Sequence, residues 1–185
     1  FPPPLLRRGF VRGVTFCNNV TIGETIRDLA ADSHCGTFAN HSEPARPTAN
    51  RIMSEEPIAA IVLAAGKGTR MKSALPKVLH RIAGHPMVCH VIDATKPLAP
   101  TRTVVVVGPD MEAVTEAVSP YPTIVQTDQA GTGDAVKTGI CILDGFSSGT
   151  VLVMFGGDPL ITTGTLRRMV TAREAGAAGV VLGVR

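Results

Sequence analysis

The chain has 185 residues, 44% hydrophobic and 18% charged, which suffices for one ordinary globular domain and leaves little room for two. A formal net charge of +3, without a dense run of lysines or arginines, argues against nucleic acid as a partner. No apolar run approaches the roughly 18 residues of a membrane-spanning helix and residues 1–30 lack a signal-peptide pattern, so we expect a cytoplasmic protein without a membrane partner.

The first part of the chain differs from the rest in composition. Residues 1–52 contain many prolines and asparagines, with interspersed serine and histidine, and show no sustained periodicity. This composition favours a poorly structured leader without a core of its own, in which residues 20–31 could form a short amphipathic helix. Met53 and the Ser-Glu-Glu-Pro after it resemble an ordinary bacterial amino terminus. We therefore expect Met53 to be the natural start and residues 53–185 to form the domain.

Short apolar runs alternate with helical patterns from residue 58 onward, which favours an α/β fold with a mainly parallel sheet and helices on both faces. The predicted strands are residues 58–64, 103–107, 123–126, 150–155 and 178–184. The predicted helices are residues 87–96, 111–118, 132–143 and 162–175. Prolines and glycines fall close to the expected ends of these elements.

A glycine turn with several cations directly follows the first predicted strand. Gly66 and Gly68 lack the Cβ that would keep a backbone amide from a phosphate oxygen. Open α/β sheets bind ligands at the carboxyl ends of their strands, where this turn is expected. Arg70, Lys72 and Lys77 could add charge-assisted contacts. The segment therefore predicts a phosphate-binding loop.

This loop fits neither of two common glycine motifs, because the spacing required by a Walker A loop and by a Rossmann fingerprint is absent. Residues 63–77 instead resemble the L-A-A-G-x-G-T-R-M…L-P-K motif of sugar-phosphate nucleotidyltransferases. Residues 77–87 and 90–93 look most like the uridyltransferase half of the bacterial bifunctional N-acetylglucosamine-1-phosphate uridyltransferase and glucosamine-1-phosphate acetyltransferase. Residues 125–133 are similar to the uracil-reading segment of that family. The resemblance covers residues 57 to about 184.

The resemblance implies a Rossmann-like nucleotidyltransferase fold and transfer of uridylyl from UTP to N-acetylglucosamine 1-phosphate, with release of pyrophosphate. In such an in-line transfer the attacking phosphate is already ionised, so positioning and charge neutralisation matter more than a protein base. The matching catalytic residues are Arg70 and Lys77. The matching nucleotide-binding residues are Leu63, Ala64, Ala65, Gly66, Gly68, Lys77, Gln126, Gly131 and Thr132.

The expected base-reading segment contains Gln126, Gln129 and Gly131-Thr132, at the end of a strand and the start of a helix. Amides and carboxamides in such a place can read a base edge, and the resemblance implies selection of uracil. Thr132 as an ordinary helix N-cap beside surface glutamines is the alternative interpretation. Asp134 departs from the family, which usually has histidine at this position.

The segment after the strand at 150–155 indicates a magnesium site. The family has Gly-Asp-any-Pro-Leu-Ile here, but this chain has Gly157 where the aspartate belongs and Asp158 one residue later. Mg²⁺ is typically held by one or two carboxylates plus substrate phosphates. As the nearest carboxylate, Asp158 is the predicted metal ligand, although a shift of one residue tends to turn a side chain to the other face.

Other chemically notable residues receive structural interpretations. The histidines at 80, 85 and 90 lie in a segment that the family uses structurally, and Asp110 and Asp128 are expected in solvated turns or caps. The four cysteines are widely spaced without a C-x-x-C pair, which argues against a zinc or redox site. They are expected to be reduced, with Cys89 and Cys141 packed on helices.

The resembling domain continues beyond residue 185 with more of its sugar pocket and an asparagine metal ligand, so we expect a fold truncated at its carboxyl end. Hexapeptide repeats of an acetyltransferase domain are absent from the sequence. A full-length protein with that domain could form homo-oligomers. The alternatives are a non-catalytic nucleotide-binding remnant, or a nucleotidyltransferase for thymidylyl transfer or for molybdenum-cofactor nucleotides.

Overall fold

The computed structural model describes residues 14–17, 56–66, 68–143 and 145–183. None of the helices within these ranges has the length and apolar character that a membrane crossing requires. The strands are β1 (Val14–Cys17), β2 (Ile58–Leu63), β3 (Arg81–Ile82), β4 (His85–Pro86), β5 (Arg102–Val107), β6 (Thr123–Val125), β7 (Thr150–Phe155) and β8 (Val181–Leu182). The α-helices are α2 (Met87–Thr95), α3 (Glu112–Ala117), α4 (Thr132–Cys141) and α5 (Thr163–Glu174), and the 3₁₀ helices are η1 (Thr69–Met71), η2 (Lys77–Leu79) and η3 (Lys96–Leu98).

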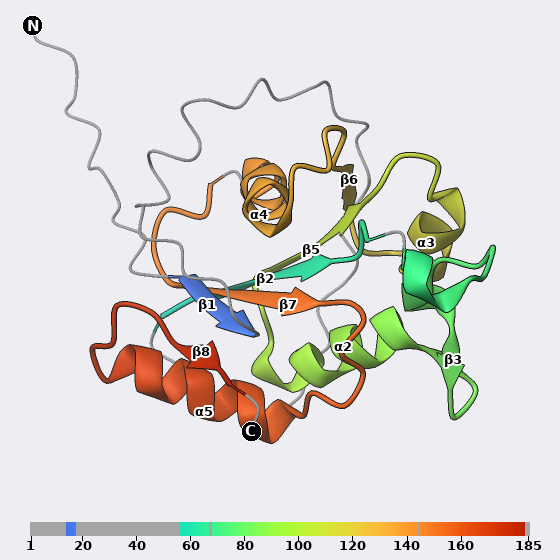
Figure 1. The fold of residues 1–185 in the computed structure, drawn as a ribbon. Coiled ribbons are helices and arrows are strands. Elements are labelled where there is room, and N and C mark those ends of the chain that lie inside the picture. The colour runs from blue at the N-terminus through green and yellow to red at the C-terminus, as the bar shows by residue number, and fades with distance from the viewer. Residues whose placement is uncertain (1–13, 18–55, 67, 144, 184–185) are drawn as a thin grey trace, which may run out of the picture.

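Six strands form one sheet in the order β6-β5-β2-β7-β1-β8, and every pairing described in it is parallel (Figure 1). The short strands β3 and β4 form a separate antiparallel hairpin before α2. Helix α4 covers one face of the sheet, and α2 and α5 lie against the other (Figure 1). The predicted α/β fold with a mainly parallel sheet and helices on both faces is therefore confirmed.

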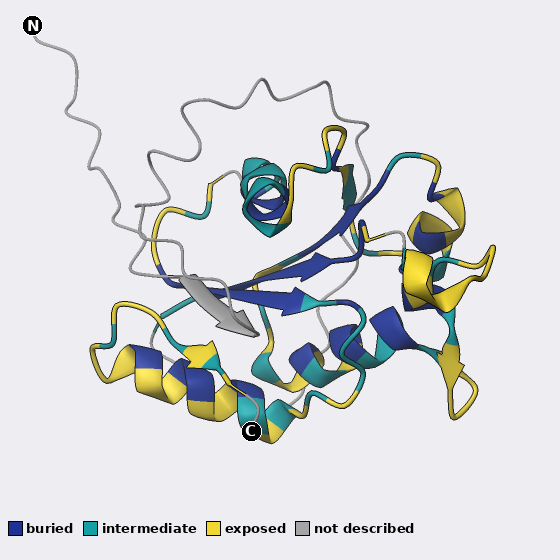
Figure 2. Ribbon diagram, viewed as in Figure 1, coloured by how far each residue is buried: buried dark blue, intermediate teal, exposed yellow. Residues whose placement is uncertain are grey.

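The central strand β2 is buried along its whole length (Figure 2). Because successive side chains of a strand point to opposite faces, Ala60 and Val62 enter the cluster beneath α2, α3 and α5, whereas Ala59 and Ile61 enter the one beneath α4. A continuous apolar run is what a strand covered on both faces requires. The apolar segment at the start of the domain thus explains the position of β2.

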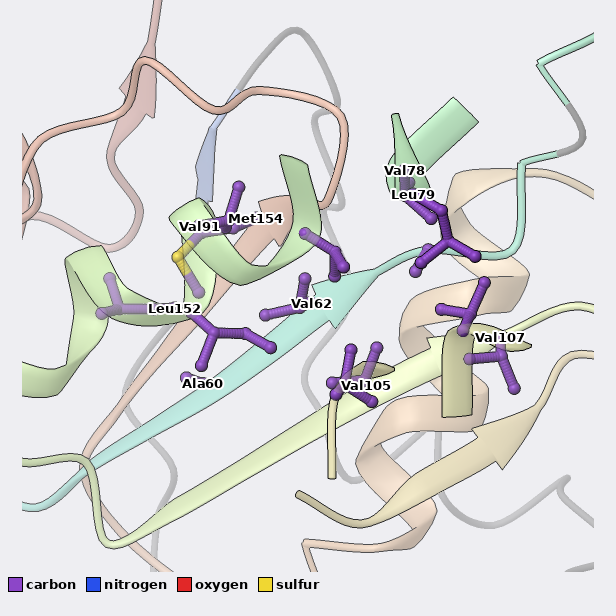
Figure 3. Close-up of a cluster of buried hydrophobic side chains, with 14 of the residues drawn as sticks. Ala60, Val62, Val78, Leu79, Val91, Val105, Val107, Leu152 and Met154 are labelled. Atoms are coloured by element: carbon purple, nitrogen blue, oxygen red, sulfur yellow. The ribbon is translucent and has the colours of Figure 1, made fainter. Parts of the chain in front are cut away.

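The larger apolar cluster joins three neighbouring strands to a helix. Val62 of β2, Val105 of β5 and Leu152 of β7 lie on the same face, with Val91 of α2 packed over them (Figure 3). Full burial of one such aliphatic side chain stabilises the fold by about 1.5–3 kcal/mol. Burial on this scale holds the strands in a fixed register, and the register sets where their carboxyl ends lie.

Four of the five predicted strands and all four predicted helices are confirmed, with ends that shift by at most two residues. Thr162 is the N-cap of α5, and its Oγ1 accepts a hydrogen bond from the backbone N–H of Thr165 at 3.2 Å. The predicted strand at 178–184 is too long, because β8 comprises only Val181–Leu182 and residue 184 lies outside the described residues. Gly183 directly follows β8 and Gly179 lies two residues before it, and neither has a side chain with which to pack on a sheet.

The leader contains one element that the sequence interpretation did not expect. Val14–Cys17 form β1, which lies between β7 and β8 and pairs in parallel with both. The expectation of a segment without regular structure therefore does not hold for these four residues. They combine β-branched and aromatic types that favour strands, but four residues are too few for periodicity to reveal a strand. The helix predicted at 20–31 lies outside the described residues.

We expect Gly139→Ala to lower the free energy of unfolding by about 1–3 kcal/mol, the usual cost of overpacking. A Cβ at this position of α4 would stand 2.7 Å from Cγ2 of Ile61 and 3.1 Å from Cγ2 of Val106. Gly133→Ala in the same helix is the matched control, because a Cβ there meets no atom within 4 Å. Urea denaturation followed by circular dichroism measures both variants, and equal stabilities would contradict the close packing of α4.

Candidate functional site

The carboxyl ends of four parallel strands lie at one edge of the sheet. Leu63 at the end of β2 is paired with Val106 of β5 and with Phe155 of β7. Val107 of β5 is paired with Val125 of β6. The segments that follow these strands therefore start side by side, as ligand-binding loops of open α/β sheets do.

Backbone hydrogen bonds extend this alignment beyond the strands and fix the first residues of the loops. The backbone N–H of Ala64 donates to the carbonyl oxygen of Val106 (2.7 Å). In the same way Gln126 donates to Val107 (2.8 Å), and Gly156 donates to Leu63 (2.9 Å). The side chains of Leu63, Ala64 and Ala65 are all buried. Any contact of these three residues with a ligand is thus restricted to the backbone, which suits their predicted role next to the glycine turn.

The predicted phosphate loop makes a left-handed turn directly after β2. Gly68 has φ 61° and is the N-cap of η1, in which Arg70 is exposed. A Cβ at Gly68 would stand 2.5 Å from the Cβ of Lys77, so the loop can pass this close only with glycine. Gly66 has nothing within 4 Å of its Cβ position and faces open space. The loop therefore lies against Lys77 and presents Gly66 and Arg70 to solvent.

Lys77 also contacts the loop after β7. A Cβ at Gly157 would lie 2.9 Å from Nζ of Lys77 and 3.1 Å from its Cε, so the end of this side chain lies against the Gly157 backbone. The structure thus brings together the predicted phosphate loop, its lysine and the segment predicted to bind metal. The Lys77 ammonium is close to where the family's aspartate would begin.

The predicted base-reading segment lies at the amino end of α4. Gln126 is buried, and its Nε2 donates hydrogen bonds to the carbonyl oxygen of Gly131 at 3.0 Å and to Oδ2 of Asp134 at 2.6 Å. Gly131, with φ 111°, is the N-cap residue of α4, and Thr132 is the first residue inside the helix. The alternative interpretation of Thr132 as the N-cap is therefore wrong, because the chain turns into the helix one residue earlier, at a glycine.

Gln129 connects two other loops of the same edge. Its Nε2 lies 3.5 Å from the carbonyl oxygen of Ala65 and 2.7 Å from the Cβ position of Gly108, which directly follows β5. Its amide thus points back to the sheet edge and leaves Gln126 as the more embedded of the two glutamines. Gly108 allows this approach because it has no side chain.

Asp158 lies on the loop after β7 and is half-buried. Its backbone N–H donates to the carbonyl oxygen of Phe155 at 3.1 Å, and its own carbonyl oxygen accepts from the N–H of Ile161 at 3.2 Å. Within the described ranges, no group of three or more His, Cys, Asp or Glu side chains is placed to hold a metal ion. One carboxylate beside a phosphate-binding loop fits a magnesium ion shared with bound phosphates, but not a site made by protein ligands alone.

The histidines at 85 and 90 tie the hairpin β3-β4 to α2. His85 Nε2 lies 3.0 Å from Asp93 Oδ2, and His90 Nε2 lies 2.8 Å from the carbonyl oxygen of Ile82. Lys96 Nζ lies 2.6 Å from the other oxygen of Asp93. Burial alone would raise the pKa of Asp93, but Lys96 and then His85 hold it below its ordinary value. These contacts agree with the structural interpretation of the segment.

The cysteines and the two turn aspartates occupy ordinary positions. Cys89 and Cys141 are free and half-buried, and burial, followed by the charge of Asp93, raises the pKa of the Cys89 thiol. Asp110 and Asp128 are exposed, and Asp110 lies in a turn with φ 58°. None of these four side chains lies among the contacts described above for the loops at the sheet edge.

A mainly parallel sheet with helices on both faces, carrying a glycine loop and a lysine at its carboxyl edge, is typical of α/β proteins that bind nucleotides. Residues 60–185 match the family described as the MobA-like NTP transferase domain. The chain therefore belongs to this family.

Similar proteins include bifunctional proteins called GlmU from several bacteria. The one from Rhodospirillum rubrum is 57% identical over 129 residues, which are 69% of this chain and 29% of that protein. The one from Paramagnetospirillum magneticum is 53% identical over 135 residues, which are 72% of this chain and 30% of that protein. The chain thus spans less than a third of the length of these relatives.

Solved structures with the same fold include Rv0371c from Mycobacterium tuberculosis, with a TM-score of 0.55, 20% identity and coverage of 65% of this chain and 61% of that one. A second structure of that protein, a complex with manganese, has a TM-score of 0.52 and 24% identity, with 64% and 60% of the chains covered. A nucleotidyl transferase from Methanothermobacter has a TM-score of 0.52 and 23% identity, with 62% and 57% covered. At these identities the likeness shows the fold alone.

Sequence reasoning missed three features of the site. Gly108 and Gly157 matter because other side chains lie against them, and a single sequence carries no signal for such long-range contacts. The sequence marked Asp134 only as a departure from the family and did not predict its hydrogen bond with Gln126. Its place three residues after the N-cap, in the first turn of α4, was the available signal, because an acidic side chain there commonly reaches back to the preceding backbone.

Gly68→Ala is expected to destabilise the protein by at least about 1 kcal/mol, because alanine is strained at positive φ and its Cβ would collide with the Lys77 Cβ. Gly66→Ala is the matched control, since its Cβ would point into open space. Guanidinium denaturation of both variants gives the two free energies of unfolding. If Gly68→Ala is as stable as Gly66→Ala, the described approach of the loop to Lys77 is wrong.

Proposed function

We propose that this chain is part of a uridyltransferase domain that binds UTP at the carboxyl edge of its sheet and transfers uridylyl to N-acetylglucosamine 1-phosphate. The observation that carries the proposal is the position of Lys77, whose side chain lies between the phosphate loop at Gly68 and the end of β7 at Gly157. An ammonium in this place can contact phosphates held by the loop amides, and its charge offsets theirs. The similarity to GlmU proteins supports the choice of UTP and of the sugar phosphate.

In the proposed reaction, a phosphate oxygen of N-acetylglucosamine 1-phosphate attacks the α-phosphorus of UTP. A new P–O bond forms there, the bond from the α-phosphorus to the bridging oxygen breaks, and pyrophosphate leaves with the electron pair. Both reactants are ionised, so no side chain needs to remove a proton. The proposed role of Lys77 and Arg70 is to hold the triphosphate and to stabilise the charge that develops on the departing oxygens.

Asp158 is the proposed ligand of Mg²⁺ in this site, together with phosphate oxygens of the nucleotide. When bound, the ion would neutralise part of the phosphate charge. The proposed product, UDP-N-acetylglucosamine, makes the domain part of the supply for peptidoglycan and lipopolysaccharide in the cytoplasm. Assembly into homo-oligomers is proposed only for a longer protein that carries the acetyltransferase domain.

A non-catalytic nucleotide-binding function is the second candidate, and one observation favours it. Gly157 stands where the resembling family has its metal-binding aspartate, and the Lys77 side chain lies against that position. A site of this composition keeps its cation for phosphate binding, but its carboxylate, Asp158, stands one residue away from the family's metal-binding position. Binding and turnover must therefore be measured separately.

We expect Lys77→Ala to weaken UTP binding by about 10- to 100-fold, the range for loss of one charge-assisted hydrogen bond. Gly157→Ala should weaken it in the same direction, because its Cβ forces the ammonium to move while the charge stays present. Arg102→Ala, which removes an exposed cation at the opposite end of β5, is the control. Isothermal titration with UTP measures all three variants, and unchanged affinity in Lys77→Ala would refute the proposed phosphate site.

Turnover is tested by pyrophosphate release with UTP, N-acetylglucosamine 1-phosphate and Mg²⁺, run beside the UTP titration. The proposed function predicts release that requires all three components and falls when Asp158 is changed to Asn. Tight UTP binding without any release would assign the chain to the non-catalytic alternative. In that case Gly157→Asp, which returns a carboxylate to the family position, shows whether the missing side chain is the cause.

A further inference from the structure

We propose that Asp134 is a positioning residue that fixes the carboxamide of Gln126 in one orientation and thereby favours a base with an N–H at ring position 3. The inference rests on the proposed function, in which Gln126 belongs to the base-reading segment. It begins from the geometry of a single buried amide. Gln126 is 4% exposed, and both hydrogens of its Nε2 are directed at oxygen atoms, those of Gly131 and Asp134.

The orientation of this amide is set by its acceptors. The carbonyl oxygen of Gly131 at 3.0 Å and Oδ2 of Asp134 at 2.6 Å can only accept hydrogen bonds. If the amide of Gln126 were turned by half a rotation, its Oε1 would face both of these oxygens and would repel them. The carboxylate makes the penalty larger than a second carbonyl would, because hydrogen bonds to charged groups are the stronger ones.

Asp134 is itself held in place. Its Oδ2 also accepts a hydrogen bond from the backbone N–H of Ala130 at 3.2 Å, and its carbonyl oxygen accepts one from Oγ1 of Thr138 at 2.9 Å. The carboxylate thus links the loop before α4, the first turn of α4 and the end of β6 through Gln126. A residue anchored in this way can impose an orientation on its partner.

The fixed amide leaves one hydrogen-bonding group unused. Oε1 of Gln126 accepts no hydrogen bond from the part of the chain that is described. Gln126 therefore offers an acceptor and no donor to a base. Uracil carries an N–H at ring position 3, whereas cytosine carries a lone pair there, which an acceptor repels.

A purely structural role for Asp134 would give a different result. Asp134 is the third residue after the N-cap, and its carboxylate accepts a hydrogen bond from the backbone N–H of Ala130. Such a contact stabilises the start of a helix, as in a capping box. Loss of that contact would lower stability and would weaken the binding of every nucleotide alike. The ratio of affinities for UTP and CTP separates the two roles, because only a change in amide orientation alters it.

The experiment titrates the full chain with UTP and with CTP, each with Mg²⁺, for the wild type, Asp134→Ala, Asp134→Asn and Asp128→Ala. We expect the wild type to favour UTP and Asp134→Ala to lose about tenfold of this preference, the scale of one hydrogen bond. Asp134→Asn keeps an acceptor oxygen and should retain most of it. Asp128→Ala removes the same charge from an exposed position of the same loop and should leave the ratio unchanged.

Three results would overturn the inference. A wild-type ratio in Asp134→Ala shows that Asp134 does not set base preference, while the proposed UTP binding stands. A wild type that prefers CTP shows that the acceptor faces a different edge of the base. A wild type that binds neither nucleotide removes the proposed function and the inference with it. Side-chain amide signals of Gln126 in an NMR spectrum provide a test without nucleotide, since free rotation in the wild type contradicts a fixed amide.

Discussion

The burial of β2 on both faces is the constraint on which the rest of the structure depends. Because its side chains alternate between two apolar clusters, a shift in its register against β5 or β7 would move one of those clusters out of place. The same register brings Leu63 level with Val106 and Phe155. The burial of β2 in the core thus decides that the predicted phosphate loop and the loop after β7 start beside each other.

At the carboxyl edge of this sheet, the candidate site depends on three glycines, which have no side chain. Gly68, Gly108 and Gly157 each lie where another side chain fills the space that a Cβ would need: Lys77 at two of them and Gln129 at the third. Close approach of loops from distant parts of the sequence is possible only because these positions carry no side chain. The glycines therefore act as contact surfaces, and their flexibility matters only at Gly68, where φ is positive.

The sequence was sufficient for most of the architecture and for the position of the glycine turn after β2, and the reason differs in the two cases. Continuous apolar runs and helical periodicity are local signals, so β2, β5, β7 and α5 could be predicted almost to the residue. The glycine turn predicted to bind phosphate was accessible because its glycines and cations lie close together in the sequence. The position of β1 was not accessible, because it depends on which distant strands meet in the sheet. The pairing of Gln126 with Asp134 is local, and only the position of Asp134 in the first turn of α4 pointed to it. A wrong N-cap at Thr132 followed from residue preference, which a glycine with φ 111° overrides.

Two departures from the resembling family change the arrangement of charges at two places in the candidate site. After β7, glycine stands in place of aspartate, so the carboxylate is displaced by one residue to Asp158 and the Lys77 side chain lies against the Gly157 backbone. Near the base-reading segment, aspartate in place of histidine adds a carboxylate that accepts from Gln126 and Ala130. The first change places the Lys77 ammonium, and no carboxylate, next to position 157, and a cation there attracts phosphate and repels a metal ion. The second makes the buried amide more rigid. In the proposed site, the first change affects the position of the metal-binding carboxylate and so bears on turnover, whereas the second affects the orientation of Gln126 and so bears on the choice of base. Turnover and base recognition can therefore change independently of each other.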